Sequence, residues 1–289
     1  MKILKKLILI ILLIFLTSFF YFFEINNHGI DETDNNSCLN VFSIEPNIIN
    51  LRTRSNEYLI IGHAYGNHAG SNKGLSHKVL DYFESLDEKT NLVLTGDFVR
   101  SGSKADLLLV QNQVNKYFNQ GLFAVGNHEI IQGSINNYYE VFKDDLFLIK
   151  ESKIDLIVAN FSTPNWLPKK LDQDKINFFI NNSNNEVVVL FSHQIFWENM
   201  TEQKPRKNGP DLLENELNQN MLDWLNFEGK KLIIISGDYG LNSDEIFCEV
   251  DVNKNVLFVA SGIYENDNDK MIRLNSFDSG FYLEEVRLP

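Results

Sequence analysis

The sequence predicts an α/β protein in which two β-sheets pack as a sandwich flanked by helices. Three observations indicate this fold class. Short apolar runs rich in Val, Ile and Leu recur along the chain, as in strands buried on both faces. In the first half, these runs alternate with segments whose apolar residues recur at helical spacing. In the last part, strand-like runs follow one another with short loops. The 289 residues, 44% of them hydrophobic, suffice for a large core.

The first part of the domain has the pattern of a β-α-β-α-β segment. Its strand-like runs are Tyr58–Ile61, Leu92–Thr95 and Leu122–Val125. Two sets of apolar residues at helical spacing separate them: Leu75, Val79, Tyr82, Phe83 and Leu86, then Leu107, Val110, Val114, Tyr117 and Phe118. Such connections predict parallel strands with right-handed crossovers.

The second part continues with alternating elements and ends in strands. We expect a strand pair over Leu146–Lys150 and Asp155–Asn160, and then a helix over Asp172–Asn182. A strand over Val187–Phe191, an exposed basic loop over Glu202–Pro210, a helix over Leu212–Phe227 and a strand over Lys231–Ser236 follow. The last strand-like runs predict a second sheet, mixed or antiparallel: Glu245–Val250, Asn255–Ala260, Met271–Asn275 and Gly280–Val286.

The N-terminus carries an uncharged apolar run, Leu7–Phe23, preceded by lysines and followed by acidic residues. This asymmetry predicts a cytoplasmic N-terminus over residues 1–6 and a transmembrane signal anchor over residues 7–23. A cleaved signal peptide is the alternative, but the run ends in aromatic residues and has no small-x-small site. We expect a linker over residues 24–55 and an extracytoplasmic domain, periplasmic or extracellular, over residues 56–289.

The net charge and the cysteines indicate which partners to expect and whether a disulfide can form. The net charge of −13 argues against nucleic acid, because affinity for its phosphates depends on Lys and Arg. Cys38 and Cys248 are the only cysteines. Outside the cytosol they can pair and tie the linker to the domain, and two unpaired thiols remain the equal alternative.

Polar motifs directly follow five of the predicted strands. They are Gly62–Asn67, Gly96–Asp97, Gly126–Glu129, Ser192–His193 and Gly237–Gly240. Loops at the carboxyl ends of strands are where open α/β sheets place their chemistry. Carboxylate, imidazole and amide side chains in these loops are suitable ligands for a metal ion. The sequence therefore predicts a metal site assembled at strand ends.

The order of these motifs resembles that of the calcineurin-like metallophosphoesterases, over roughly Asn56 to Gly240. The most specific match is Gly126-Asn127-His128-Glu129, which fits the Gly-Asn-His-Asp/Glu motif of that family. The resemblance implies a helix-flanked two-sheet sandwich. It also implies that Asn127 binds metal and that His128 assists the leaving group of a phosphoester.

The same resemblance assigns further ligands and also marks departures. Asp97 matches the carboxylate that bridges two metal ions, and His193 matches a later metal-binding histidine. Where the family has Asp-x-His, this chain has His63-Ala64-Tyr65. Where it has Gly-His-x-His, this chain has Gly237-Asp238-Tyr239-Gly240, and the second Asp of Gly-Asp-x-x-Asp is Arg100.

These changes fall unevenly on the two metal sites that the resemblance implies. One site keeps a full donor set: Asp97, Asn127, His193 and Asp238. It suits a divalent ion such as Mn²⁺, Zn²⁺, Fe²⁺ or Mg²⁺. The other has only His63, Tyr65 and the shared Asp97, so we expect one or two ions per chain. Arg100 can replace the charge of a missing ion by gripping phosphate oxygens.

Together these observations predict a membrane-anchored, extracytoplasmic hydrolase that cleaves a phosphoester with metal-activated water. Its location suggests an envelope sugar-phosphate or a lipid-linked glycan as substrate. One alternative is a catalytically inactive relative that binds phosphate or glycan, and another is a hydrolase of a different ester. Each motif alone also has a structural interpretation: Gly-Asp is often only a turn, and His193 fits a buried core imidazole.

Overall fold

The structure is a computed structural model in which the packed part of the chain is one compact unit, Asn36–Pro289. The Leu7–Phe23 run, the Glu202–Pro210 loop and most of the helix expected over Leu212–Phe227 lie outside the described residues. None of the helices in the described part is long and apolar enough to cross a membrane. The described residues are 36–46, 54–67, 69–86, 90–130, 135–162, 170–195, 225–240 and 245–289.

The first sheet has five strands in the order β11-β10-β1-β2-β3. Strands β1 to β3 are parallel, as the β-α-β-α-β pattern predicts, and β10 and β11 add to β1 in antiparallel fashion. The strands are β1 (Arg54–Ile61), β2 (Asn91–Thr95), β3 (Gln120–Ala124), β10 (Lys270–Phe277) and β11 (Phe281–Arg287).

The second sheet has six strands in the order β4-β5-β6-β7-β9-β8. Its inner strands are parallel, and β4 and β8 close its two edges in antiparallel fashion. The strands are β4 (Leu146–Lys150), β5 (Ile154–Ala159), β6 (Val187–Ser192), β7 (Lys231–Ser236), β8 (Phe247–Asp251) and β9 (Val256–Ala260).

The C-terminal strands do not form a sheet of their own, contrary to the sequence-based expectation. Instead, β8 and β9 extend the second sheet, while β10 and β11 extend the first. The position of each strand along the chain can be predicted from the sequence, because apolar periodicity is a local property. The partner of a strand cannot be predicted in this way, because β9 pairs with β7 and β10 pairs with β1 across long stretches of chain.

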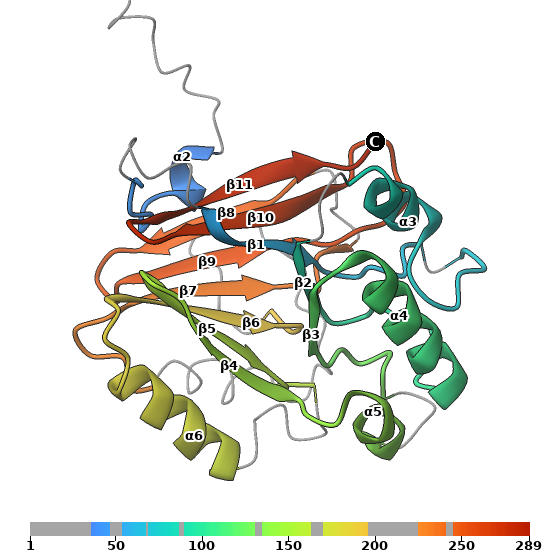
Figure 1. Ribbon diagram of the computed structural model, residues 1–289, viewed down its shortest axis with the longest axis horizontal. Helices are drawn as coiled ribbons and strands as arrows, with labels where there is room; N and C mark the ends of the chain where they lie inside the picture. Colours follow the sequence, from blue (N-terminus) through green and yellow to red (C-terminus); the bar gives the residue numbers. More distant parts are fainter. Residues whose placement is uncertain are drawn as a thin grey trace, which may run out of the picture. The chain divides into compact units, whose positions relative to one another are not determined.

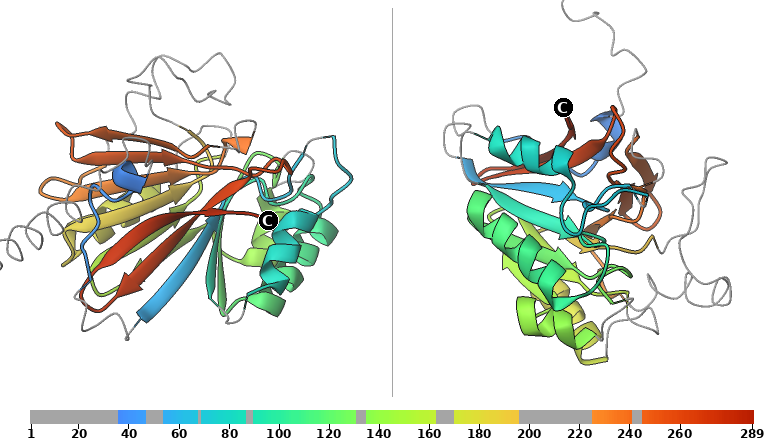
Figure 2. Two further views of the ribbon diagram at one scale, coloured as in Figure 1. Left: turned by 90° about the horizontal axis from the view of Figure 1, so that it is seen from above. Right: turned by 90° about the vertical axis from the view of Figure 1, so that its right-hand side faces the viewer.

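Helices cover the outer faces of the sandwich (Figures 1 and 2). Three helices pack on the first sheet: α3 (His77–Glu84), α4 (Lys104–Tyr117) and α5 (Ile135–Phe142). The side chains of Ser76 and Ser103 cap α3 and α4 by accepting a backbone N–H. Helix α6 (Lys170–Asn181) lies on the side of the second sheet (Figure 1). The two-sheet, helix-flanked architecture that the sequence predicts is therefore confirmed.

Successive side chains of a strand point to opposite faces of its sheet, and whole strands are apolar here because both faces are buried. In β1, Tyr58 and Ile60 point into the core between the sheets, where they join Val93 and Ile233. Their neighbours Leu59 and Ile61 point outward and join the cluster beneath the helices. Both faces of β1 are therefore buried, which is the condition that a continuous apolar run indicates.

The segment just before the first strand packs on the domain, although the sequence places it in the linker. Helix α2 (Asn36–Leu39) precedes a turn, and Leu39 and Phe42 are buried in the core between the sheets. Cys38 and Cys248 form a disulfide that ties α2 to β8. Of the two alternatives left open by the sequence, the structure therefore has the bonded one. Ile44 forms a single antiparallel bridge to Phe281 of β11.

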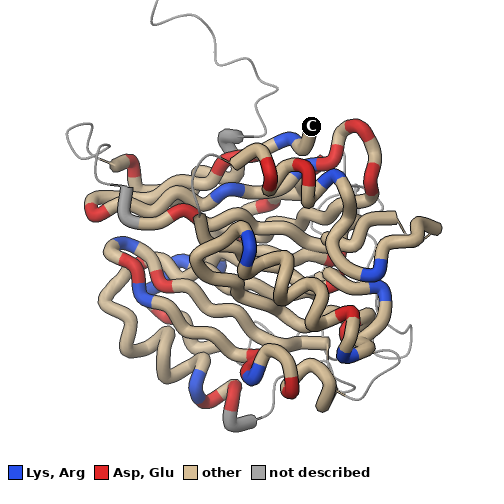
Figure 3. Tube along the Cα trace, turned by 45° about the vertical axis from the view of Figure 1, so that its right-hand side comes forward, with Lys and Arg blue, Asp and Glu red and all other residues tan. Residues whose placement is uncertain are grey.

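Figure 3 marks the charged residues along the Cα trace. Lys and Arg are interspersed there with Asp and Glu along the described residues. This distribution agrees with the net charge of −13.

Candidate metal centre

Motif glycines bring the strand ends of the two sheets into direct backbone contact. A Cβ on Gly62, after β1, would lie 2.3 Å from Cα of Gly237, which follows β7 in the other sheet. A Cβ on Gly237 would lie 2.0 Å from the carbonyl oxygen of Thr95. These positions require glycine because another backbone occupies the space. The close approach places the polar motifs of both sheets around one point.

Asp97 is the central carboxylate of this cluster. It has a positive φ of 51° and is buried, so its loop needs support from its surroundings. Glu129 supplies this support, because its carboxylate accepts the backbone N–H groups of Asp97, Phe98, Val99 and Gly126 at 2.6–3.1 Å. No role for Glu129 follows from the sequence pattern, and its place directly after His128 is the only signal there.

His193 faces the oxygen atoms of three neighbouring side chains. Its Nδ1 lies 3.0 Å from the carbonyl oxygen of Thr95 and must donate to it, because a carbonyl only accepts. Its Nε2 therefore faces the cluster. The oxygens around Nε2 are Asn127 Oδ1 at 3.1 Å, Asp97 Oδ1 at 3.4 Å and Asp238 Oδ1 at 3.7 Å.

The donor set around His193 fits a divalent metal ion. Ligand atoms of Asp97, His193 and Asp238 all lie within 4.8 Å of one another, and the three residues are buried. Two carboxylates, an imidazole and an amide oxygen suit Mn²⁺, Zn²⁺, Fe²⁺ or Mg²⁺. Histidine ligands commonly hold their other nitrogen on a backbone carbonyl, as His193 does on Thr95. The four residues that the sequence singled out for this site therefore lie together.

The charged groups of the cluster shift the pKa values of His193 and Asp97. Burial opposes charge on both His193 and Asp97. The Asp97 and Asp238 carboxylates nevertheless raise the pKa of His193 above its ordinary value. The nearby imidazoles, His193 first, hold the pKa of Asp97 below its ordinary value. A cation at this point is thus favoured electrostatically.

His63, Tyr65 and His128 form the other side of the cluster. The Nε2 atoms of His63 and His128 each lie 3.9 Å from Asp97 Oδ2. The Tyr65 hydroxyl lies between the two imidazoles, 3.3 Å from His63 Nε2 and 3.4 Å from His128 Nε2. His63 is buried, whereas 18% of the His128 side chain is exposed. His128 is therefore accessible to a ligand.

Arg100 lies beside the cluster but holds two structural contacts. Its guanidinium donates to the carbonyl oxygen of Asn67 at 2.8 Å and lies 5.9 Å from the centre of the Tyr65 ring. Its own carbonyl oxygen accepts from His128 Nδ1 at 3.0 Å. The backbone of Arg100 thus orients His128, and the guanidinium remains a candidate for contact with phosphate.

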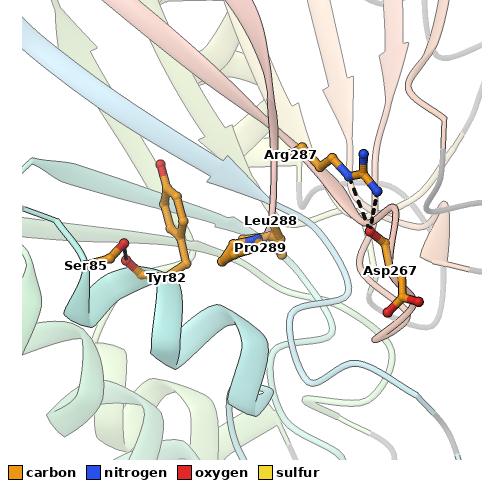
Figure 4. Close-up of a pocket in the computed structure, with 6 residues that line it drawn as sticks. All are labelled: Tyr82, Ser85, Asp267, Arg287, Leu288 and Pro289. Carbon is orange, nitrogen blue, oxygen red and sulfur yellow. Dashed lines mark hydrogen bonds between the residues drawn. The ribbon is translucent and has the colours of Figure 1, made fainter.

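A separate pocket of about 460 Å³ lies near the C-terminal residues (Figure 4). It is lined by Tyr82, Ser85, Asp267, Arg287, Leu288 and Pro289. None of these is a candidate site residue. Arg287 donates to the carbonyl oxygen of Asp267 at 2.9 and 3.3 Å, so its guanidinium supports a loop. The pocket has no part in the metal centre.

Comparisons with known proteins give no family and only distant structural similarity. No family model and no curated protein sequence matches the chain significantly. A single mutant of Vps29 from Entamoeba histolytica is 9% identical, with coverage of 81% of this chain and 99% of that one and a TM-score of 0.34. The 5'-nucleotidase precursor from Thermus thermophilus is 10% identical, with coverage of 81% and 54% and a TM-score of 0.44.

A third structure is the phosphopantetheinyl hydrolase PptH from Mycobacterium tuberculosis. It is 10% identical, with coverage of 72% of this chain and 90% of that one and a TM-score of 0.38. Such low identities and TM-scores leave the function of this chain to be argued from its own residues.

Proposed function

We propose that this protein is a metal-dependent phosphoester hydrolase, anchored in a membrane by residues 7–23 with its domain outside the cytosol. The observation that carries the proposal is the position of His193 Nε2. It lies 3.1–3.7 Å from oxygens of Asn127, Asp97 and Asp238. These residues come from four separate strand ends in both sheets, which favours a built site over a chance group of polar side chains.

Asp97, Asn127, His193 and Asp238 would hold the ion. When bound, a divalent ion supplies a ligated water of lowered pKa and polarises a phosphoryl oxygen. The Thr95 carbonyl fixes the His193 ring so that Nε2 is available as a ligand. Glu129 fixes the Asp97 loop through the backbone.

His128 would serve the leaving group. Donation from Nδ1 to the Arg100 carbonyl leaves Nε2 as the atom that exchanges protons, and the side chain is partly exposed. An imidazole protonated at Nε2 can give that proton to a departing oxygen. The Arg100 guanidinium would contact the non-bridging oxygens of the phosphoester. An envelope sugar-phosphate or lipid-linked glycan remains the proposed substrate because of the expected location.

The test combines metal content with hydrolysis on the purified full chain. We expect Mn²⁺ or Zn²⁺ to bind and to support hydrolysis of p-nitrophenyl phosphate or bis-p-nitrophenyl phosphate. Asp238→Ala should lose both metal and activity. His128→Ala should keep the metal and lose about 10²–10⁴-fold in rate. Asp81→Asn, an exposed carboxylate on α3, is the matched control and should change neither.

A non-catalytic phosphate- or glycan-binding protein is the second candidate. The burial of Asp97, His193 and Asp238 favours it, because a hydrolase must admit water and substrate to its ion. Metal binding without turnover of either p-nitrophenyl substrate, together with protection of the fold by inorganic phosphate, would favour binding over catalysis. Absence of metal binding after incubation with Mn²⁺ and Zn²⁺ would refute the hydrolase.

A further inference from the structure

Gly240 marks a place where a ligand side chain is excluded by another residue. This position is the last of the Gly237–Gly240 motif, where the resemblance implies a histidine. A Cβ added to Gly240 would lie 2.6 Å from His63 Nδ1, 2.7 Å from Cγ and 3.1 Å from Cδ2. The φ of Gly240 lies outside the positive range, so the backbone conformation does not demand glycine. The His63 ring fills the space that a side chain at position 240 would take.

The His63 ring is fixed in that space. Its Nδ1 lies 3.0 Å from the carbonyl oxygen of Ile263 and donates to it. The residue is buried, and its own φ of 52° directs the side chain from a left-handed backbone. With Nδ1 engaged, the lone pair of the ring is on Nε2, which faces the Tyr65 hydroxyl and Asp97 Oδ2.

The Tyr65 hydroxyl lies between two such nitrogens. His128 also donates its Nδ1 to a carbonyl, that of Arg100, so in the neutral ring its Nε2 is an acceptor as well. Both imidazoles pack against the Tyr65 ring in tilted geometry, with centroids 4.6 Å away for His63 and 4.9 Å away for His128. One hydroxyl proton thus faces two acceptor nitrogens, and Tyr65 is fully buried.

The geometry points to a centre that takes one divalent ion, in which the Tyr65 hydroxyl lies between His63 and His128 and contacts the His63 nitrogen that could otherwise bind a second ion. This inference rests on the proposed function, because the first ion is the one that Asp97, Asn127, His193 and Asp238 would hold. By the resemblance, a second ion would draw on positions 63 and 240, which here offer His63 Nε2 and a glycine. The hydroxyl faces the lone pair, and glycine supplies no ligand.

The first test measures ions per chain at saturating Mn²⁺ by elemental mass spectrometry, with electron paramagnetic resonance on the same full-chain samples. We expect one ion and the hyperfine pattern of an isolated Mn²⁺ instead of that of a spin-coupled pair. Tyr65→Phe should keep one ion with an affinity within about threefold of the original protein, a change of under about 0.7 kcal/mol.

The possible outcomes separate the two proposals. Two ions per chain, or a spin-coupled signal, would overturn the one-ion inference and leave the hydrolase standing. Loss of the ion in Tyr65→Phe would also overturn it, because Tyr65 would then be a ligand. No ion in the original protein would overturn both proposals.

The second test uses the packing of His63 against position 240. Gly240→Ala should lower the unfolding midpoint of the original protein, whereas the same change in a His63→Asn background should lower it much less. Asn accepts the positive φ of position 63 and removes the ring. Equal losses in both backgrounds would overturn the assignment of this space to His63.

A rebuilt site provides the third test. The variant His63→Asp, Tyr65→His and Gly240→His restores the ligand types that the resemblance implies and removes the ring and the hydroxyl together. We expect it to bind two Mn²⁺ ions per chain, which doubles the metal content. A folded triple variant that still binds one ion would show that these three positions do not set the number of ions.

Discussion

The Glu129 carboxylate holds the backbone of Asp97 in place: Oε2 accepts the Asp97 N–H at 2.9 Å and the Gly126 N–H at 2.6 Å. Its other oxygen accepts the N–H groups of Phe98 and Val99. The loops after β2 and β3 are therefore joined by one side chain. Because Asp97 faces three imidazoles, the position of this loop fixes the geometry of the whole centre.

Glu129→Gln tests this positioning role. Gln has the same shape but replaces one acceptor oxygen with a donor, so buried N–H groups lose their partner. We expect the free energy of unfolding to fall by about 1–3 kcal/mol. Metal affinity should fall as well, because Asp97 is no longer held. The measurement is denaturant unfolding with and without Mn²⁺. Glu140→Gln, an exposed carboxylate on α5, is the control, and equal behaviour of the two variants would contradict the role.

Gly96→Ala probes the packing of His193 against the second motif. Gly96 has a φ of +82°, and a Cβ there would lie 2.5 Å from atoms of the His193 ring. Gly229 is a matched control, because its φ is +73° but nothing lies within 4 Å of an added Cβ. Gly229→Ala should cost only the backbone strain of about 1–2 kcal/mol. Gly96→Ala should cost about 1–3 kcal/mol more and weaken metal binding. Equal midpoints in urea would show that the ring moves aside freely.

Metal affinity should rise with pH, because an ion and a proton compete for His193 Nε2. The Asp97 and Asp238 carboxylates raise the pKa of His193 above its ordinary value of 6.5. Below that raised pKa, each ion must displace one proton, so the affinity should fall by about tenfold per pH unit. Calorimetry in buffers of different ionisation enthalpy should detect proton release. His77→Gln, an exposed histidine on α3, should leave the profile unchanged.

The raised pKa of His193 has the opposite effect on the stability of the metal-free protein, which should fall as pH rises. A histidine whose folded pKa is raised stabilises the fold fully below the unfolded pKa, and this stabilisation is lost as pH rises through the folded pKa. The metal-free protein should therefore lose stability upon this rise in pH, while added Mn²⁺ restores it. A metal-free unfolding midpoint that rises through this window would contradict the arrangement around His193.

The Cys38–Cys248 disulfide closes a sequence separation of 210 residues. Long closed loops restrict the unfolded chain most, so its removal should cost about 2–5 kcal/mol of unfolding free energy. The double variant Cys38→Ser, Cys248→Ser should show this loss in denaturant unfolding. Reductant should destabilise the original protein and leave the double variant unchanged. Insensitivity of both to reductant would mean that the bond contributes nothing.

Local patterns in the sequence were sufficient to predict most strands and the motifs that follow them. Runs such as Leu92–Thr95 are buried on both faces, and that condition leaves a continuous apolar signature. Helix α5 is absent from the elements expected above, although Tyr138, Val141 and Phe142 have the helical spacing of its buried face.

Other features depend on contacts that no local pattern records. The sheet that each C-terminal strand joins is set by pairing with β1 or β7, far away in the chain. The docking of Leu39 and Phe42 depends on the core that other segments build. The role of Glu129 depends on four N–H groups meeting in space. The family resemblance indicates the ligand positions, but the packing of the His63 ring against Gly240 can be seen only in the structure.

The pairing of β1 with β10 also affects how the domain folds. Strand β1 has β2 on one side and β10 on the other, so one of its edges stays open until residues 270–277 pair with it. Contacts between such distant segments slow folding, and an unpaired apolar strand invites association with other chains. The incompletely folded chain therefore exposes an apolar strand edge until its C-terminal segment pairs.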